Sequence, residues 1–272
     1  MNGGADVTKI ASRDNALLVR VRKLSRDPVA YRKLNAVWLE GDHLCRAALA
    51  QGRRPLHALI SESAWDDETL RALAMAAPRV ARVPEPLFKG LGTLESPGRI
   101  GFVLPAAAPA ELQAGIASVV LDRLQDAGNV GSILRSAAAF GVRQVIALKG
   151  TAALWSPKVL RAAMGAHFAL HLVEGIAAAD LHALGVSLVA TSSHATIALQ
   201  QAELPEPCAW VFGHEGQGIE PALLQRCALT VRIPQPGGEE SLNVASAAAV
   251  CLYETSLRSR LTAQDAAARR LR

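Results

Sequence analysis

The sequence has few of the features that mark metal-binding, disulfide-linked or membrane proteins. Its four cysteines, at positions 45, 208, 227 and 251, are widely separated and form no CxxC pair. This spacing predicts neither a zinc site nor a disulfide framework and is typical of a reducing cytoplasm. No apolar run reaches ~18 residues without a charge, glycine or proline, and the amino terminus lacks the charged-then-apolar pattern of an export signal. We therefore expect a cytoplasmic protein without a membrane span or a bound metal.

Two common nucleotide-binding motifs are also missing. Gly218 is followed by isoleucine and glutamate, where a nucleoside-triphosphatase loop needs a lysine and a hydroxyl residue. The dinucleotide fingerprint is absent from the first strand-to-helix turn, which argues against a nicotinamide oxidoreductase. His167 and His171 are four residues apart, but Phe168 occupies the position of the metalloprotease glutamate. His194 follows Thr191-Ser192-Ser193 and could touch a ligand, but we interpret all three histidines as ordinary loop or core-edge residues.

The chain is long and apolar enough for one large domain or two smaller ones. Of its 272 residues, 50% are hydrophobic and 19% are charged. The 29 lysines and arginines outnumber the 24 acidic residues and give a formal net charge of +5, which is compatible with a polyanionic partner. Basic residues gather near the two ends of the chain, although such runs are also typical of a solvated helical face. The early group contains Arg20, Arg22, Lys23, Arg26, Arg32 and Lys33.

The first part of the chain, residues 1–104, has the alternating pattern of a small α/β domain. Residues 1 to about 12 show no periodicity and are expected to be disordered, whereas residues 15–24 have the period of an amphipathic, arginine-rich helix. The later pattern predicts strands at 36–39, 56–60, 80–83 and 100–104 and helices at 42–51, 66–76 and 84–91. The run PAAAP at 105–109 predicts an extended linker, which we place at 105–114.

A second domain is expected at residues 115–272. Short, continuous apolar runs are typical of strands that are buried on both faces of a parallel sheet. The pattern predicts strands at 118–121, 144–148, 169–173, 187–190, 210–212 and 229–233, and helices at 130–140, 157–164, 176–184 and from 244 to about 258. We therefore predict an α/β fold with an open, mostly parallel sheet.

Polar side chains and glycines follow several of these strands. Five glycines lie in the two loops 213–218 and 234–243, where they allow the main chain to approach a ligand closely. The loops at the carboxyl edge of a parallel sheet converge, so polar residues far apart in the chain are expected to share one pocket. These residues are Asn129 with Arg135, Glu215, and Ser241 with Asn243. An arginine on so apolar a helix needs a partner, and a structural ion pair with Glu215 or another carboxylate is the alternative to a functional role.

Three motifs of the second domain resemble, in order and spacing, those of the SpoU/TrmH family of RNA 2′-O-ribose methyltransferases, within the SPOUT superfamily. They are Asn129-x-Gly131-x-x-x-Arg135, Gly213-x-Glu215-Gly216-x-Gly218, and Ile233-Pro234 with Gly237 and Ser241-Leu242-Asn243-Val244. Their joint occurrence is specific, whereas any one alone would be weak. The first domain also looks like the family's substrate-binding domain at Ser12, Asn15, Tyr31-Arg32-Lys33, Glu40-Gly41 and Ser96-Pro97-Gly98.

The resemblance implies a SPOUT-type fold whose carboxyl-terminal helix is threaded into a trefoil knot. It also implies S-adenosylmethionine bound in the knot, a homodimer, and a small amino-terminal α/β domain that binds the RNA substrate. The implied cofactor contacts are main-chain groups of Gly213, Ile233 and Leu242, together with Gly218, Pro234, Gly237 and Asn243. The implied catalytic residues are Asn129, Arg135, Glu215, Ser241 and Asn243, and no metal is implied.

The reaction that the resemblance implies is methyl transfer from S-adenosylmethionine to a ribose 2′-hydroxyl. In the family, the arginine that matches Arg135 is held to activate this hydroxyl, sometimes as a general base. Because a guanidinium stays protonated in proteins, the alternative is that Arg135 stabilises the developing alkoxide or binds the adjacent phosphate. The separate first domain favours ribosomal RNA over transfer RNA as the substrate. A non-catalytic, RNA-binding ribosome assembly factor is the remaining alternative, and the intact motif residues argue against it.

Overall fold

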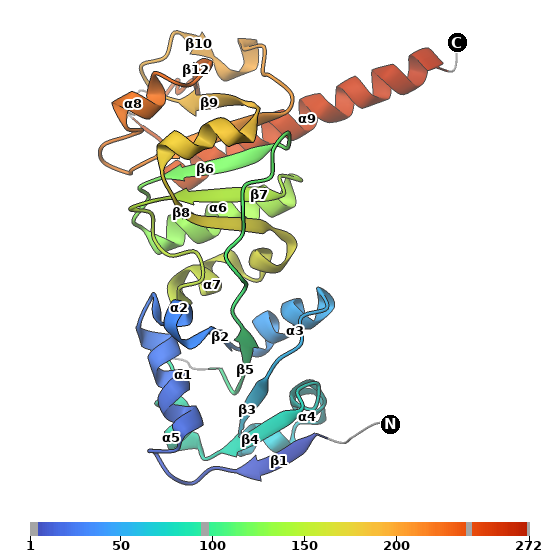
Figure 1. Ribbon diagram of the computed structural model, residues 1–272. Coiled ribbons are helices and arrows are strands. Elements are labelled where there is room, and N and C mark those ends of the chain that lie inside the picture. Colours follow the sequence, from blue (N-terminus) through green and yellow to red (C-terminus); the bar gives the residue numbers. More distant parts are fainter. Residues whose placement is uncertain (1–4, 94–97, 238–240, 271–272) are drawn as a thin grey trace. The chain divides into compact units, whose positions relative to one another are not determined.

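The computed structural model describes residues 5–93, 98–237 and 241–270, with side chains up to residue 260. The chain divides into two compact units (Figure 1). Unit 1 contains the residues up to Ala108 together with Trp155–Phe168, and unit 2 contains Pro109–Leu154 and the residues from Ala169 onward. The segment Trp155–Phe168 therefore packs with unit 1, although strands of unit 2 precede and follow it in the sequence.

Unit 1 is built on a five-stranded sheet with the strand order β1-β4-β3-β5-β2. Strand β5 is antiparallel to β2 and β3, whereas β1, β4 and β3 pair in parallel. The strands are β1 (Asp6–Lys9), β2 (Ala36–Glu40), β3 (His57–Ser61), β4 (Arg79–Val83) and β5 (Ile100–Pro105). The helices are α1 (Ala16–Arg26), α2 (Ala30–Leu34), α3 (Asp42–Ala50), η1 (Ser63–Asp66), α4 (Glu68–Ala74), α5 (Glu85–Lys89) and α7 (Pro157–Ala163), followed by η2 (Ala166–Ala169).

The amphipathic helix predicted near the amino terminus is present as α1. The Asn15 side chain caps it by accepting a hydrogen bond from the N–H of Leu17 at 2.9 Å. Its buried face carries Leu18, Val21 and Leu24, which recur at helical spacing. The basic residues between these positions are therefore left on the surface of unit 1.

The expected disorder at residues 1–12 is wrong for β1, which forms a regular parallel ladder with β4. All four β1 residues are exposed, so the strand carries no hydrophobic pattern that the sequence could reveal. It is stabilised by main-chain pairing to a strand about seventy residues later, which local periodicity does not report. Ser96 and Pro97, part of the expected resemblance, lie outside the described residues.

Unit 2 contains a seven-stranded sheet with the order β10-β12-β9-β11-β6-β7-β8, and every pairing in it is parallel. The strands are β6 (Ser118–Asp122), β7 (Gln144–Leu148), β8 (His171–Ile176), β9 (Ser187–Thr191), β10 (Ile197–Ala198), β11 (Cys208–Gly213) and β12 (Leu229–Arg232). The helices are α6 (Ala127–Ala139), η3 (Ala178–Leu184), η4 (Leu199–Gln201), α8 (Pro221–Leu224) and α9 (Val244–Arg270). The predicted α/β class and mostly parallel sheet are confirmed.

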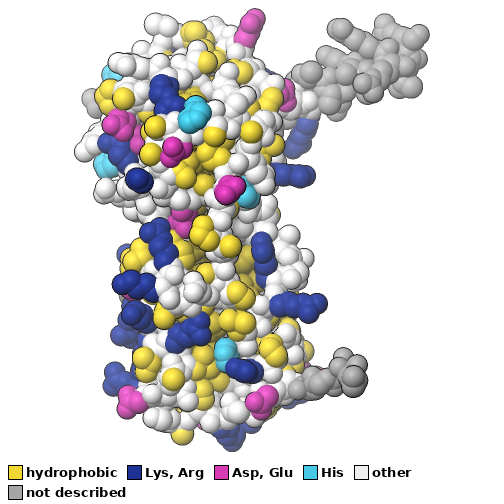
Figure 2. Space-filling model, in the orientation of Figure 1, with side chains coloured by type: hydrophobic (Ala, Val, Ile, Leu, Met, Phe, Trp, Pro, Cys, Tyr) yellow, Lys and Arg dark blue, Asp and Glu magenta, His cyan; other side chains and the backbone are white. Residues whose placement is uncertain are grey.

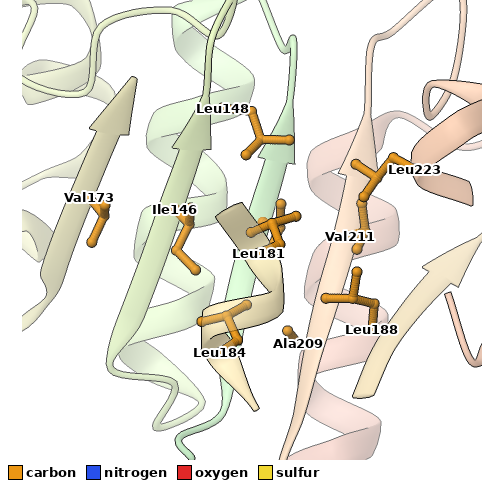
Figure 3. Packing of buried hydrophobic residues seen from close by; sticks show 10 residues of the cluster. Ile146, Leu148, Val173, Leu181, Leu184, Leu188, Ala209, Val211 and Leu223 are labelled. Carbon is orange, nitrogen blue, oxygen red and sulfur yellow. The ribbon is translucent and has the colours of Figure 1, made fainter. Parts of the chain in front are cut away.

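Buried aliphatic side chains hold the sheet of unit 2 against its helices. Alternate residues of the central strands, among them Ile146 and Val211, point at Leu181 and Leu184 of η3 and at Leu223 of α8 (Figure 3). On α9, Thr255 accepts a hydrogen bond from Nε1 of the buried Trp210 at 3.0 Å, and α9 packs against α6 and β11. Segment 178–184, expected as an α-helix, is a 3-10 helix, and α9 extends beyond the expected end near residue 258.

The strand order places two distant segments side by side at the centre of the sheet. From β6 the chain adds β7 and then β8 on one side, after which it crosses to β9 on the other side of β11. Strands β6 and β11 are therefore neighbours, and their carboxyl ends open at a point where the strand order reverses. In open parallel sheets, such a point is where ligands bind. None of the described helices is long and apolar enough to cross a membrane.

Candidate functional site

A cavity of about 1030 Å³ lies at the carboxyl edge of the unit 2 sheet. Its wall comes from the segments that follow β9, β11 and β12 and from the start of α9. The segments are 191–194, 213–219 and 241–244, with Leu224, Ile233, Gln235 and Ala247. Sequence-predicted residues on this wall are Gly213, Glu215, Gly218, Ile233, Ser241, Leu242 and Asn243. Pro234 and Gly237 are not among the described residues that line it.

The turn after β11 is folded so tightly that Gly213 has no room for a side chain. A Cβ there would lie 2.2 Å from the nitrogen of Ile219. Gly218 has a φ of +69°, which favours glycine. The main chains of His214 and Gly218 exchange hydrogen bonds of 3.1 and 2.8 Å, which close the turn. This part of the cavity wall is therefore largely main chain.

The His214 ring holds the same turn from within. Its Nδ1 accepts hydrogen bonds from the N–H groups of Gly216 at 3.0 Å and Gln217 at 3.2 Å. A ring nitrogen that accepts hydrogen bonds does so through its lone pair, so Nδ1 is the acceptor that faces these N–H groups. The side chain thus acts as an asparagine does in a turn, by accepting from main-chain N–H groups that follow it.

Three of the predicted catalytic residues meet in one hydrogen-bonded group. Asn129, on the first turn of α6, donates through Nδ2 to Glu215 Oε1 at 3.2 Å. Its Oδ1 accepts from Asn243 Nδ2 at 3.0 Å. Asn243 also caps α9, because its Oδ1 accepts from the N–H groups of Ala245 and Ser246. The group therefore joins the start of α6 to two loops that lie 86 and 114 residues further along the chain.

The Glu215 carboxylate is also held by the main chain that leads into α6. It accepts from the N–H of Asp126 at 3.2 Å and from the N–H of Gln125 at 3.4 Å. Partial burial by itself would raise the pKa of Glu215, but hydrogen bonds from its own N–H, from Asn129 and from these two N–H groups together hold it below the ordinary value. Glu215 is therefore an ionised acceptor at neutral pH.

Arg135 lies elsewhere. It is exposed on α6, it does not line the cavity, and among the described residues it makes no hydrogen bond or ion pair. The structural ion pair with Glu215 that the sequence left open is wrong, because Glu215 is bonded to Asn129 and to main-chain N–H groups. The buried side chains of α6 lie on other faces of the helix, at Val130, Ile133, Leu134 and Ala137.

The segment 191–194, including His194, was not identified as part of the site from the sequence. His194 is a loop residue, as expected, and it lies on the cavity wall with Thr191, Ser192 and Ser193. The sequence did contain a signal for this segment, because the predicted strand 187–190 is followed by the hydroxyl residues Thr191, Ser192 and Ser193. Polar residues directly after a buried strand were also the pattern that identified the other loops. His167 is buried in unit 1, and His171 Nε2 hydrogen-bonds to the carbonyl of Glu111 at 2.7 Å.

Comparisons with known proteins give a consistent result. The model of the SpoU rRNA Methylase family matches residues 117–253. A 23S rRNA (guanosine(2553)-2′-O)-methyltransferase of Bacillus subtilis is 33% identical over 226 residues, which cover 81% of this chain and 88% of that protein. An uncharacterized tRNA/rRNA methyltransferase of Synechocystis is 32% identical over 262 residues, covering 92% and 94%.

Solved structures are similar over both units. A crystal structure of an RNA 2′-O ribose methyltransferase has a TM-score of 0.79 and 28% identity, covering 93% of this chain and 100% of that chain. The SpoU methyltransferase AviRb of Streptomyces viridochromogenes, in complex with the cofactor AdoMet, has a TM-score of 0.78 and 25% identity, covering 91% and 98%.

Glu215→Gln tests whether the charge of Glu215 stabilises the group of three residues. Because the pKa of Glu215 in the folded state lies below the ordinary value of 4.5, its ionised form stabilises the fold at neutral pH. This contribution is lost as the pH falls through the folded-state pKa. We expect E215Q to lower the Tm at pH 7. The difference in Tm between wild type and E215Q should become smaller as the pH is lowered to about 3.

Thermal melts followed by circular dichroism at a series of pH values measure this gap. Glu203→Gln is the matched control, because Glu203 is exposed and forms no hydrogen bond or ion pair with other described residues. Its Tm should follow wild type throughout. A difference in Tm between wild type and E215Q that stays constant from pH 7 to about 3 would show that ionisation of Glu215 does not stabilise the fold.

Proposed function

Because the chain belongs to the SpoU rRNA methylase family, we propose that it transfers the methyl group of S-adenosylmethionine to a ribose 2′-hydroxyl of ribosomal RNA. The observation that carries the proposal is the cavity at the strand-order reversal, whose wall holds Glu215 and Asn243, both hydrogen-bonded to Asn129. Relatives named as 23S rRNA 2′-O-methyltransferases support ribosomal over transfer RNA. The reaction would take place in the cytoplasm, where ribosomal RNA is found.

The cavity suits a cofactor of this kind. Its volume of about 1030 Å³ is at the upper end of small-molecule sites, which span about 300–1,000 Å³. The Gln235 Oε1 atom is buried without a partner among the described residues, so it is available to accept a hydrogen bond from a ligand. When bound, S-adenosylmethionine supplies an electrophilic methyl group on its sulfonium. Main-chain groups at Gly213, Gly218, Ile233 and Leu242 would hold it, with Pro234, Gly237 and Asn243 shaping the loop.

The proposed catalytic residues have separate tasks. The 2′-hydroxyl loses its proton to solvent as its oxygen attacks the methyl group, so negative charge develops on that oxygen. A fixed guanidinium is suited to stabilise this charge or to hold the neighbouring phosphate, and we assign this task to Arg135. Asn129, Glu215 and Asn243 orient the loops around the reacting groups, and Ser241 contributes a hydroxyl to the wall. Correct placement of the two reactants supplies much of the rate.

A methyl-transfer assay tests the proposed function directly. Full-length protein, tritiated S-adenosylmethionine and ribosomal RNA that lacks its natural methyl groups should give radiolabelled RNA with a 2′-O-methyl group at a defined position. Transfer RNA serves as the alternative substrate. Binding of S-adenosylmethionine without methylation of either RNA would support a non-catalytic role, and no binding at all would overturn the proposal.

We also propose that the active form is a homodimer. Arg135 is exposed and away from the cavity of its own chain. The neighbouring α9 exposes apolar side chains at Val250 (41%), Tyr253 (54%) and Leu257 (39%), and Tyr253 packs edge-on against Phe140 at the end of α6. An arginine beside an exposed apolar face is typical of a surface that is covered in an oligomer. In the proposed dimer, Arg135 of one protomer completes the site of its partner.

Two further features of the family fold are proposed for this chain. A trefoil knot that places the start of α9 behind the loops of the cavity agrees with the packing of α9 against α6 and β11. The similarity to a solved ribose methyltransferase over nearly the whole chain supports the same fold. We propose that residues 1–104, which belong to unit 1, bind the RNA substrate, because helices α1 and α2 are basic. Residues 105–114 would join them to a catalytic domain at residues 115–272.

The basic flank of unit 1 is formed by α1 and α2. Figure 2 shows Lys and Arg side chains gathered along this flank. Several of them are already used within the unit: Arg20 donates to the carbonyl of Leu34, and Arg26 donates to that of Gly90. Lys23 and Lys33 are exposed, and their side chains have no hydrogen-bond partner among the described residues. These two lysines are therefore the best candidates to contact RNA phosphates.

Mixing two inactive variants tests the position of Arg135. If Arg135 acts across the dimer, a subunit with Arg135→Ala and a subunit with Asn243→Ala form one intact site per heterodimer. Random reassortment makes half of the dimers heterodimers, so about a quarter of wild-type activity should return. The controls are each variant alone and the double variant mixed with wild type. No recovery after reassortment, verified by native mass spectrometry, would place Arg135 in the site of its own chain.

Lys33→Glu tests the RNA surface of unit 1. We expect weaker binding to ribosomal RNA and a smaller salt dependence, with the slope of log K against log salt concentration reduced by about 1, because one phosphate contact is lost. Affinity for S-adenosylmethionine should not change. The matched control is Arg54→Glu, an equal charge reversal at an exposed position of unit 1 outside α1 and α2. Equal losses in both variants would indicate net charge rather than a defined surface.

A further inference from the structure

Arg123 follows β6 in an unusual backbone conformation. Its φ is +58°, and only Asn35 and Met164 share a positive φ among the described residues other than glycine. A residue with a side chain is uncommon in this region and stays there only where its surroundings require it. Here the N–H of Arg123 donates to Thr151 Oγ1 at 3.1 Å, and the Thr151 hydroxyl donates to the carbonyl of Leu121 at 2.9 Å.

The Arg123 guanidinium is fixed by a buried carboxylate. Its Nε and one terminal nitrogen donate to the two oxygens of Asp122 at 3.1 and 3.2 Å. The Asp122 side chain is 2% exposed, and it also accepts from the N–H of Glu220 at 2.8 Å. Paired contacts of this kind fix the plane of a guanidinium as well as its position. The remaining N–H groups of Arg123 therefore point in defined directions.

These N–H groups reach the turn that walls the cavity. One terminal nitrogen donates to Gln217 Oε1 at 3.3 Å, and the other donates to the carbonyl of Gly218 at 3.5 Å. The same carbonyl accepts the N–H of His214, which closes the turn. Among the described residues, no other side chain from outside 213–219 hydrogen-bonds to residues 216–218. Arg123 is therefore the external support of this part of the turn.

We propose that Arg123 is a positioning residue that holds the turn 214–218 in the shape that binds S-adenosylmethionine. The inference rests on the proposed function of the cavity. A wall made of main-chain groups binds tightly only if these groups are oriented before the ligand arrives, because ordering them on binding costs affinity. Arg123 does not line the cavity, so it acts through Gln217 and Gly218.

Two substitutions separate this role from a purely structural one. Both Arg123→Gly and Arg123→Ala remove the guanidinium, but only glycine relaxes at a φ of +58°. The glycine variant should therefore have the higher Tm of the two. If Arg123 positions the turn, both variants should lose the same affinity for S-adenosylmethionine, about tenfold, the factor expected when hydrogen bonds from a charged group are lost.

Isothermal titration calorimetry of the full-length protein with S-adenosylmethionine measures the affinities, and thermal melts measure the Tm. The matched control is Arg143→Ala, which removes an exposed arginine of unit 2 outside the cavity and should bind as wild type does. In turnover assays, the KM for S-adenosylmethionine should rise, while kcat and the KM for RNA stay near wild type.

The outcomes of these measurements distinguish the two hypotheses. Wild-type protein that binds no S-adenosylmethionine would overturn the proposed function itself. Wild-type protein that binds, with R123G and R123A binding equally well, would overturn the role of Arg123 alone. An affinity that falls only in the less stable R123A would also overturn it, because the loss would then follow from backbone strain and not from the missing contacts to the turn.

Discussion

The arrangement of the site depends on the amide side chain of Asn129, which donates one hydrogen bond and accepts another. Asn129 donates to Glu215 and accepts from Asn243, so it joins the connection between β6 and α6 to the turn after β11 and to the start of α9. Aspartate at this position would face the Glu215 carboxylate without a proton to donate, and leucine would satisfy neither neighbour. An amide offers a donor and an acceptor without net charge, and the position of both loops follows from that property.

The parallel sheet makes this meeting possible. Strands β6 and β11 are about ninety residues apart in the chain, yet they pair in register from Ser118 with Ala209 to Asp122 with Gly213. Strand β6 leads into the segment that carries Asn129, and β11 leads into the turn that carries Glu215. The register between the two strands therefore sets the distance between Asn129 and Glu215. The buried cluster below, with Val120 and Val211, keeps that register because a slip by one residue would turn both side chains to the other face.

Much of this arrangement could be predicted from the sequence, for identifiable reasons. The strands of unit 2 are continuous apolar runs, and the convergence of Asn129, Glu215 and Asn243 follows from strands whose carboxyl ends share one edge. The remaining features of the fold and the site could not be predicted from local sequence patterns. Strand β1 is wholly exposed and is defined by its partner, and His194 joins the wall only through strand order. Whether Arg135 pairs with Glu215 depends on competing main-chain donors that no side-chain pattern reports.

Where the wall of the cavity is main chain, its shape depends on residues that lie outside the cavity. Because the wall at Gly213 and Gly218 has no side chains to substitute, its shape is set by groups that bond to it from elsewhere, such as the carboxylate of Asp122, which accepts the N–H of Glu220. Arg135 differs from these groups, because its side chain is exposed and has no hydrogen-bond or ion-pair partner among the described residues. The chain thus has a shaped cavity and an exposed guanidinium that does not line it.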